Sequence, residues 1–221
     1  MEWKYCYGYC KFRGEIPHQR LGGSPCDCPS SDDAAASLFQ TLYGLIAQKA
    51  LHIFYMSEEQ RNFQLSKVIG LENMKKTSVL SSCFLKKDLE KMEVLRKKPK
   101  NNKYAIIDGQ GGWHTEAKGV ERALDLADSS GFDYELIKTK THEEMLEKLS
   151  DFSWFIFLPF IHDTCPRVVI ESKLMGLNVI TNSRSQHIYE DWWHKKSPEE
   201  SQKYLAGRPE WFRSQLKELH G

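Results

Sequence analysis

The most informative side chains fall within residues 159–171, where a loop gives way to a helix. Pro166 suits the first position of that helix and Gly176 suits the residue just past its end. Asp163 then precedes the helix, and Glu171 lies inside it among apolar residues, about 7.5 Å further along the axis. A carboxylate with apolar neighbours is costly unless it binds something, and the two hydroxyls of a ribose are suitable donors. The alternative is that Glu171 is a helix-surface residue and Asp163 a capping residue.

A second loop, residues 108–114, contains Gly109, Gly111 and Gly112 and is followed by Lys118. Glycines let backbone N–H groups approach a ligand closely, and the N-terminus of a helix favours anions. Lys118 would add a positive charge in the first helical turn, so the combination suits a diphosphate. The three glycines do not make a dinucleotide fingerprint, and a plain tight turn stays open as the alternative.

Four of the six cysteines lie within the first 28 residues. They are Cys6, Cys10, Cys26 and Cys28. Four thiolates can hold a structural Zn²⁺ in tetrahedral coordination. Reduced structural thiols and disulfides remain alternatives. A small zinc-containing nucleic-acid binder is a further alternative, against which the formal net charge of +1 argues.

The second half of the chain alternates short apolar runs with segments of helical periodicity. This alternation predicts an α/β fold with a Rossmann-like parallel sheet, covered by helices on both faces. In such a sheet, ligands bind beyond the carboxyl ends of the strands, where both loops described above would lie. The predicted strands are 104–107, 134–137, 154–158 and 179–181, and the predicted helices are 117–129, 142–149 and 166–175.

The first half predicts a smaller α/β part followed by a basic linker at residues 97–103. Its elements are a helix ending near 49, a strand at 51–56, a helix from 57 to 68, a strand at 77–82 and a helix at 87–96. We therefore expect an N-terminal domain at 1–100 and a Rossmann-like domain at 101–190. Residues 191–221 are expected to form a helical tail that packs across both.

The stretch HDTCPRVVIESKLMGLNVI, residues 162–180, resembles the donor-binding signature of retaining, nucleotide-sugar-dependent glycosyltransferases of the GT-B fold (group 1 type). In that family an acidic residue and a Glu are separated by seven residues, and a Gly and an apolar strand follow. Lys118-Gly119 resembles the family's phosphate-binding helix start. Residues 55–61 and 79–82 resemble the segment that closes its N-terminal domain. The resemblance covers roughly residues 50 to 190.

The resemblance implies transfer of a sugar from a nucleotide diphosphate to a hydroxyl acceptor with retention, and no cofactor is required for catalysis. Asp163 would contact the transferred sugar as the catalytic acidic residue, in place of the more usual Glu. Glu171 would bind the donor ribose and Lys118 the diphosphate. The remaining donor-binding residues would be Gly111, Gly112, His162, Arg167 and Val168. The acceptor would be a glycan, a lipid or a small molecule.

Composition excludes some classes and leaves one alternative. The longest apolar run, Trp154–Ile161, has eight residues, whereas a bilayer span needs roughly 20. No signal peptide is evident, and the near-neutral charge gives no support for a nucleic-acid partner. We therefore expect a soluble cytoplasmic protein without a transmembrane segment. Because only about 100 residues precede the linker, a non-catalytic nucleotide-sugar-binding or interaction module of the same fold is the alternative.

Overall fold

The computed structural model describes residues 44–67, 76–108, 117–160 and 162–220. The chain forms two compact units, the first from residues 1–55 and 59–79 and the second from residues 56–58 and 80–221. Both units contain parallel strands joined in sequence by helices, so the predicted α/β class is confirmed for the described residues.

In the first unit, two short parallel strands pair side by side, β1 (Ile53–Tyr55) and β2 (Thr77–Val79). Helix α4 (Glu58–Lys67) lies between them in sequence. A hydrogen bond of 2.9 Å between His52 Nε2 and Ser78 Oγ links the residue before β1 to β2. The predicted strands and helix are therefore present, with the strands shorter than expected. Residues 44–49 are helical, as predicted for the end of the first helix.

The second unit is built on a four-stranded parallel sheet in the order β4-β3-β5-β6. Its strands are β3 (Asn101–Ile107), β4 (Tyr134–Ile137), β5 (Phe152–Phe157) and β6 (Asn178–Thr181). Its helices are α5 (Lys86–Arg96), α7 (Val120–Ser130), α8 (His142–Leu149), α9 (Arg167–Leu174), the 3₁₀ turn η2 (Gln186–Tyr189), α10 (Asp191–His194) and α11 (Pro198–His220). The chain runs from β3 outward to β4 and from β5 outward to β6 in the opposite direction. The carboxyl ends of β3 and β5 are thus the switch point of this sheet.

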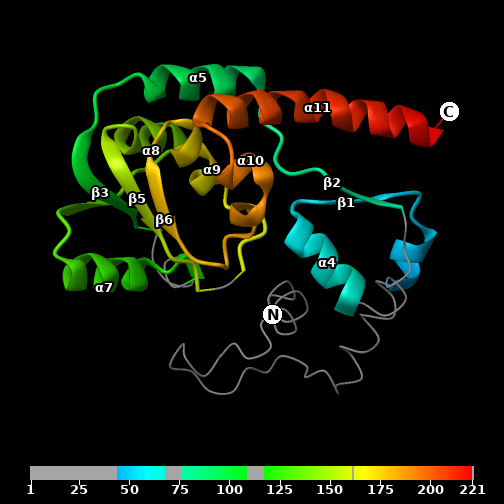
Figure 1. Cartoon of the computed structure of the whole chain (residues 1–221), viewed down its shortest axis with the longest axis horizontal. Helices are drawn as coiled ribbons and strands as arrows, with labels where there is room; N and C mark the ends of the chain where they lie inside the picture. Colours follow the sequence, from blue (N-terminus) through cyan, green and yellow to red (C-terminus); the bar gives the residue numbers. More distant parts are fainter. Residues whose placement is uncertain (1–43, 68–75, 109–116, 161, 221) are drawn as a thin grey trace. The chain divides into compact units, whose positions relative to one another are not determined.

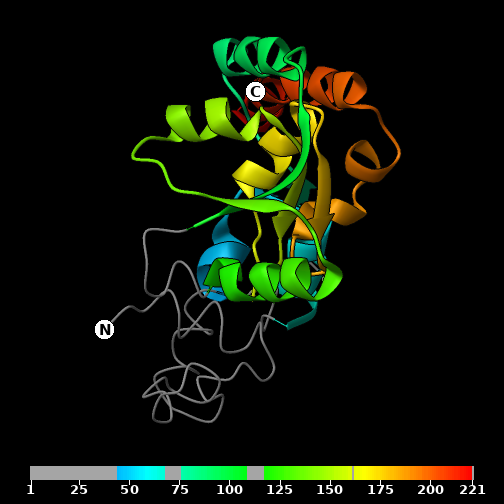
Figure 2. The ribbon, with the colours of Figure 1, turned by 90° about the vertical axis from the view of Figure 1, so that its left-hand side faces the viewer.

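Helices cover both faces of this sheet. Figure 1 and the perpendicular view in Figure 2 place α7 on one face and α5, α8, α9 and α11 on the other. Two buried clusters match these two layers. Ile106 and Ile156 pack with Val120 and Ala123 of α7, whereas Phe155 belongs to the larger cluster on the opposite face. Because helices cover both faces of the sheet, β5 and the second half of β3 are largely apolar, which is why the parallel sheet was predictable.

Local capping chemistry explains why two helices start where they do. The Thr141 hydroxyl accepts the Glu144 N–H at 3.1 Å and caps α8. Ser197 and Glu200 form a reciprocal capping box ahead of α11, with hydrogen bonds of 2.9 and 3.2 Å. Pro198 then occupies the first helical position, which its fixed φ favours. The predicted tail helix is confirmed.

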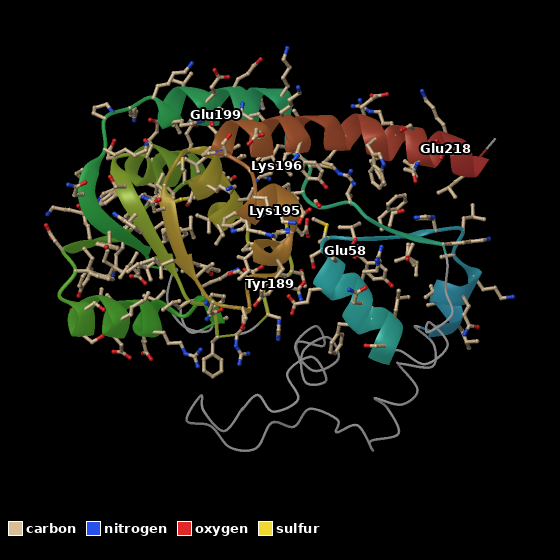
Figure 3. The ribbon with its side chains drawn as sticks, viewed as in Figure 1. Glu58, Tyr189, Lys195, Lys196, Glu199 and Glu218 are labelled. Carbon is tan, nitrogen blue, oxygen red and sulfur yellow. The ribbon has the colours of Figure 1, made fainter. Side chains whose placement is uncertain are left out.

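Helix α11 packs against α5, α9 and α10 within the second unit. Figure 3 labels Lys195 and Glu199, which flank the turn from α10 into α11, and Glu218 near the far end of α11. The Glu199 carboxylate pairs with the guanidinium of Arg96 on α5 at 2.5 Å.

Among the described helices, none combines the length and apolar character that a bilayer crossing demands.

The basic segment at residues 97–103 does not separate the compact units. Helix α5 buries Leu89, Met92 and Leu95 in the main core of the second unit. Residues 97–100 therefore join α5 to β3 inside that unit, and the division falls near residue 80 instead of residue 100. The surface charges of this region suggest an interdomain linker, but the apolar face that α5 buries joins it to the second unit.

The start of α7 lies very close to the end of β5. Gly119 has a φ of 71°, and a Cβ built on it would lie 1.7 Å from the carbonyl oxygen of Leu158. The N–H of Phe160 donates to the Ala117 carbonyl at 2.9 Å, which closes the same contact from the other side. No residue other than glycine fits this position, because the opposing atom belongs to the backbone.

Replacing Gly119 by alanine therefore tests this approach. We expect Gly119→Ala to lower the free energy of unfolding by about 3 kcal/mol or more, because backbone overlap adds to the cost of a positive φ. Gly131→Ala is the matched control, since Gly131 has a φ of 65° but a Cβ added to it would meet nothing within 4 Å. It should lose only about 1 kcal/mol. Urea denaturation measures both, and equal losses would contradict the steric argument.

Candidate functional site

The candidate site is the carboxyl edge of the four-stranded sheet. Lys118, at the start of the segment that leads into α7, reaches across this edge to Asp163 in the loop after β5. The Lys118 Nζ lies 2.5 Å from Asp163 Oδ2. The side chain of Lys118 is 48% exposed, whereas that of Asp163 is 12% exposed. The two residues that the sequence singles out in separate loops are thus direct partners.

Asp163 is held in place by the loop that follows β6. Its N–H donates to the Arg184 carbonyl at 2.8 Å, and its carbonyl accepts the Gln186 N–H at 3.2 Å. Its Oδ1 accepts the Cys165 N–H at 3.2 Å. Both carboxylate oxygens therefore have partners, and the backbone on either side of the loop is fastened. The position of this carboxylate is consequently set by two loops.

A second ion pair lies at the same edge and was not anticipated from the sequence. Lys138, directly after β4, pairs with Asp108, directly after β3, with 2.6 Å between Nζ and Oδ2. The lysine side chain is 71% exposed and the aspartate 17%. The sequence does contain a signal for this pair: each residue directly follows a predicted strand, and the two strands are neighbours in the sheet.

Glu171 is buried in α9 and has two partners. Its side chain is 1% exposed, with Oε1 accepting from Arg167 Nε at 2.8 Å and Oε2 lying 2.9 Å from His142 Nε2. Hydrogen bonding to Glu171 raises the pKa of Arg167, whose Nη2 also lies 3.2 Å from Asp88. The part that His142 plays here was not evident from the sequence. A ribose could reach Glu171 only if His142 or Arg167 gave up its hydrogen bond.

The three ion pairs share one pattern. In each, the carboxylate is mostly buried and the cation is roughly half exposed or more. The cations can therefore turn toward a ligand while the carboxylates stay fixed. An anion arriving at this edge would compete with these carboxylates for Lys118, Lys138 and Arg167.

An apolar cavity of about 170 Å³ lies beneath Lys118. Lys118 is the charged residue of its lining, and the other walls include Ile107, Met145, Phe157 and Val168. Lys118 Nζ also lies 5.8 Å from the centre of the Phe157 ring, within the range of a cation–π contact. This cavity is smaller than the roughly 300 Å³ at which ligand clefts usually begin, so it can take at most a small apolar group.

Most of the remaining predicted site residues belong to segments that the structure does not describe. Gly111, Gly112 and the four N-terminal cysteines Cys6, Cys10, Cys26 and Cys28 lie outside the described residues. His162 is described and partly buried in the loop after β5. Within the described ranges, no group of three or more potential metal ligands could hold a metal ion.

Comparisons with known proteins leave the family of this chain open. A scan against models of known protein families finds no match, and a search of curated proteins finds none either. The assignment of a function therefore depends on the geometry of the sheet edge and on the resemblance described above.

The unequal burial of Glu171 and Arg167 leads to a stability prediction. Arg167→Ala leaves the buried carboxylate with one partner, and we expect a loss of about 2–3 kcal/mol in unfolding free energy. Arg213→Ala, which breaks an exposed Arg–Glu pair on α11, should cost no more than about 0.5 kcal/mol. Adding Glu171→Leu to Arg167→Ala should recover most of the loss, because no buried charge remains. Chemical denaturation measures all three variants, and a double variant no more stable than Arg167→Ala would refute the account.

Proposed function

We propose that this chain binds a nucleotide-diphosphate sugar at the carboxyl edge of its parallel sheet and transfers the sugar to a hydroxyl acceptor with retention. The observation that carries the proposal is the Lys118–Asp163 contact of 2.5 Å at this edge. The two residues are 45 positions apart in sequence, and the resemblance gives one to the diphosphate and the other to the sugar. Their proximity supports a single site that spans the bond to be broken.

Electrostatics support the choice of an anionic donor. Lys118, Lys138 and Arg167 present exposed cationic groups, and each is paired with a carboxylate that is mostly buried. A diphosphate offers these cations more acceptor oxygens and more charge than one carboxylate does. The N-terminus of α7, 11 residues long, adds its dipole at the same place.

In the proposed reaction, the acceptor hydroxyl oxygen forms a bond to the anomeric carbon as the bond from that carbon to the diphosphate oxygen breaks. Both events occur on one face of the sugar, so configuration is retained. The hydroxyl proton passes to the departing phosphate oxygen. Negative charge grows on the diphosphate, where Lys118 and the helix dipole stabilise it without a metal ion. Asp163 contacts the sugar that is transferred.

Glu171 can bind a ribose only if one of its present hydrogen bonds is exchanged. Its two oxygens are engaged by Arg167 and His142, both of which are about half exposed. A ribose would replace one of these donors, and the released side chain would then face solvent or the ligand. This exchange keeps the buried carboxylate paired throughout, which the burial of Glu171 requires.

A non-catalytic nucleotide-sugar-binding module is the second candidate. The observation that favours it is that Asp163, one methylene shorter than the Glu usual in the resembled family, already has both oxygens engaged, one by Lys118 and one by the Cys165 N–H. A binding module would use the same cations and leave the sugar intact. Binding alone therefore does not separate the two candidates, and turnover does.

Binding is tested with Lys118→Ala. In calorimetry with adenosine, guanosine and uridine diphosphates, the best-bound one should bind about 10- to 100-fold more weakly to this variant, whereas the matching nucleoside should be unaffected. The matched control is Lys148→Ala, which removes a lysine of similar exposure that pairs at 2.6 Å with Glu135 away from this edge. Equal affinities of wild type, variant and control would remove the diphosphate site from the proposal.

Transfer is tested with Asp163→Asn and a nucleotide sugar chosen by thermal shift. If the chain is an enzyme, release of nucleoside diphosphate should fall about 100-fold, equivalent to about 2.7 kcal/mol of transition-state stabilisation. Asp163→Glu should keep activity, because it restores the longer side chain. Water can act as a slow acceptor, so the natural acceptor is not needed. A wild type that binds the donor and releases no diphosphate would favour the binding module.

A further inference from the structure

Helices α5 and α11, which pack against each other in the second unit (Figure 1), border a cavity that is larger than the one beneath Lys118. The volume of this α5–α11 cavity is about 570 Å³. Small-molecule sites usually have volumes of roughly 300 to 1,000 Å³, so the cavity is large enough for a ligand. Its walls come from α5 and the residues just before it, from the first residue of α9 and from the middle of α11.

One part of the wall is apolar. Its apolar residues are Phe84, Leu85, Leu89, Ala206 and Pro209. Phe84 and Leu89 also belong to the main core of the second unit, which fixes this side of the cavity. Leu85, in contrast, is 62% exposed. A ligand with an apolar part would remove some of this surface from water, which is favourable.

The other part of the wall is charged. It consists of three cationic side chains, Lys86, Arg167 and Arg213, and two carboxylates, Asp88 and Glu210. The charged residues of the wall therefore have a formal surplus of one positive charge. A ligand with a single negative charge would balance this surplus, whereas a diphosphate would exceed it.

Arg213 is the cation that is best placed to accept a further partner. Its Nη1 donates to Glu210 Oε2 at 2.9 Å, and its side chain is 66% exposed. A guanidinium has five N–H donors in a planar fork, so a second carboxylate can bind beside Glu210. Arg167 is more fully engaged, because it contacts both Asp88 and Glu171. It therefore contributes positive charge to the wall more than free donors.

The N-terminus of α5 opens onto the same cavity. Leu85 is the N-cap residue of this 11-residue helix and Lys86 is its first residue, and both line the cavity. A leucine has no side-chain oxygen with which to accept the first N–H groups of the helix. The positive end of the helix dipole thus adds to the charge of Arg213 and Arg167.

A neighbouring cavity of about 370 Å³ lacks this combination of features. It lies further along the same two helices and shares Ala206, but its other lining residues are charged or polar, among them Glu93, Lys97 and Gln202. The α5–α11 cavity differs from it by having large apolar side chains next to its cations. This difference favours a ligand that has both an anionic group and an apolar part.

We propose that the α5–α11 cavity binds a small monocarboxylate that carries an apolar chain or ring. The carboxylate lies between Arg213 and the N-terminus of α5, and the apolar part lies against Phe84, Leu85 and Leu89. The site uses neither Lys118 nor Asp163, so it does not depend on the proposed sugar transfer.

The first test is calorimetry on the full chain at pH 7 with octanoate and hydrocinnamate. At least one of them should bind about tenfold or more tightly than acetate, which lacks the apolar part. Hydrocinnamyl alcohol, which has the ring of hydrocinnamate without its charge, should also bind about tenfold more weakly than the acid. If neither acid binds, or if acetate or the alcohol binds as well as the acids, the proposal is overturned.

Cys83 locates the bound ligand, because it is exposed and lines the cavity. Trypsin places Cys83 and Cys165 in different peptides, residues 77–86 and 149–167, so mass spectrometry follows the reaction of each with N-ethylmaleimide. With the acid at about ten times its dissociation constant, the Cys83 rate should fall about tenfold, because few sites remain empty. The Cys165 rate should not change. An unchanged Cys83 rate, or equal slowing of both thiols, would overturn the proposed location.

Three variants identify the cation that binds the carboxylate. Arg213→Ala should weaken the acid about tenfold and leave the alcohol unaffected, because only the acid has a charge to lose. Lys217→Ala is the matched control, since it removes an exposed cation one helical turn further along α11 that does not line the cavity. Lys118→Ala should also leave the affinity for the acid unchanged. If Lys118→Ala weakens the acid as much as Arg213→Ala does, the carboxylate binds at the sheet edge and the proposal is wrong.

These measurements are separate from those that test the proposed function. Loss of diphosphate binding in Lys118→Ala concerns the sheet edge alone, and loss of carboxylate binding in Arg213→Ala concerns the α5–α11 cavity alone. Either proposal can therefore fail while the other stands.

Discussion

The close approach of the α7 start to the carbonyl of Leu158 is the constraint on which the sheet edge depends. Gly119 permits this approach because it lacks a side chain and tolerates a positive φ. The contact brings the first turn before α7 down onto the end of β5. Lys118 precedes Gly119 in the chain, so its position is set by the same contact, and its ammonium group reaches Asp163. Without this packing, the two charges would belong to separate loops.

The edge is held together by ion pairs in which burial is unequal. Desolvation is most costly for the carboxylates of Asp163, Asp108 and Glu171, and each is compensated by a cation that remains in contact with water. Such an arrangement stabilises the fold only modestly, because the exposed partners are well solvated. Its value for function is that the exposed cations can exchange a carboxylate for a ligand, provided that the buried carboxylate keeps a partner. The unequal burial of the two partners therefore explains both how the edge is held together and how it could receive an anion.

The segment after β6 also holds the carboxyl edge of the sheet in place. Asp163 is fastened through its backbone to Arg184 and Gln186, and the next residue, His187, pairs with Glu190 at 3.1 Å. Glu190 ties this histidine to the segment before α5 through Ser81.

The sequence by itself determined the alternation of strands and helices in the second unit, and β4 and α8 have the bounds that it predicted. It did so because apolar periodicity, capping residues and the Pro and Gly at helix ends act over a few neighbouring residues. It also placed Lys118 and Asp163 at one sheet edge, since carboxyl ends of parallel strands meet there. Only the tertiary structure decided that α5 belongs to the second unit, and that Glu171 binds His142. Those contacts join residues far apart in sequence, and they depend on strand order, crossover direction and register, which no local pattern records.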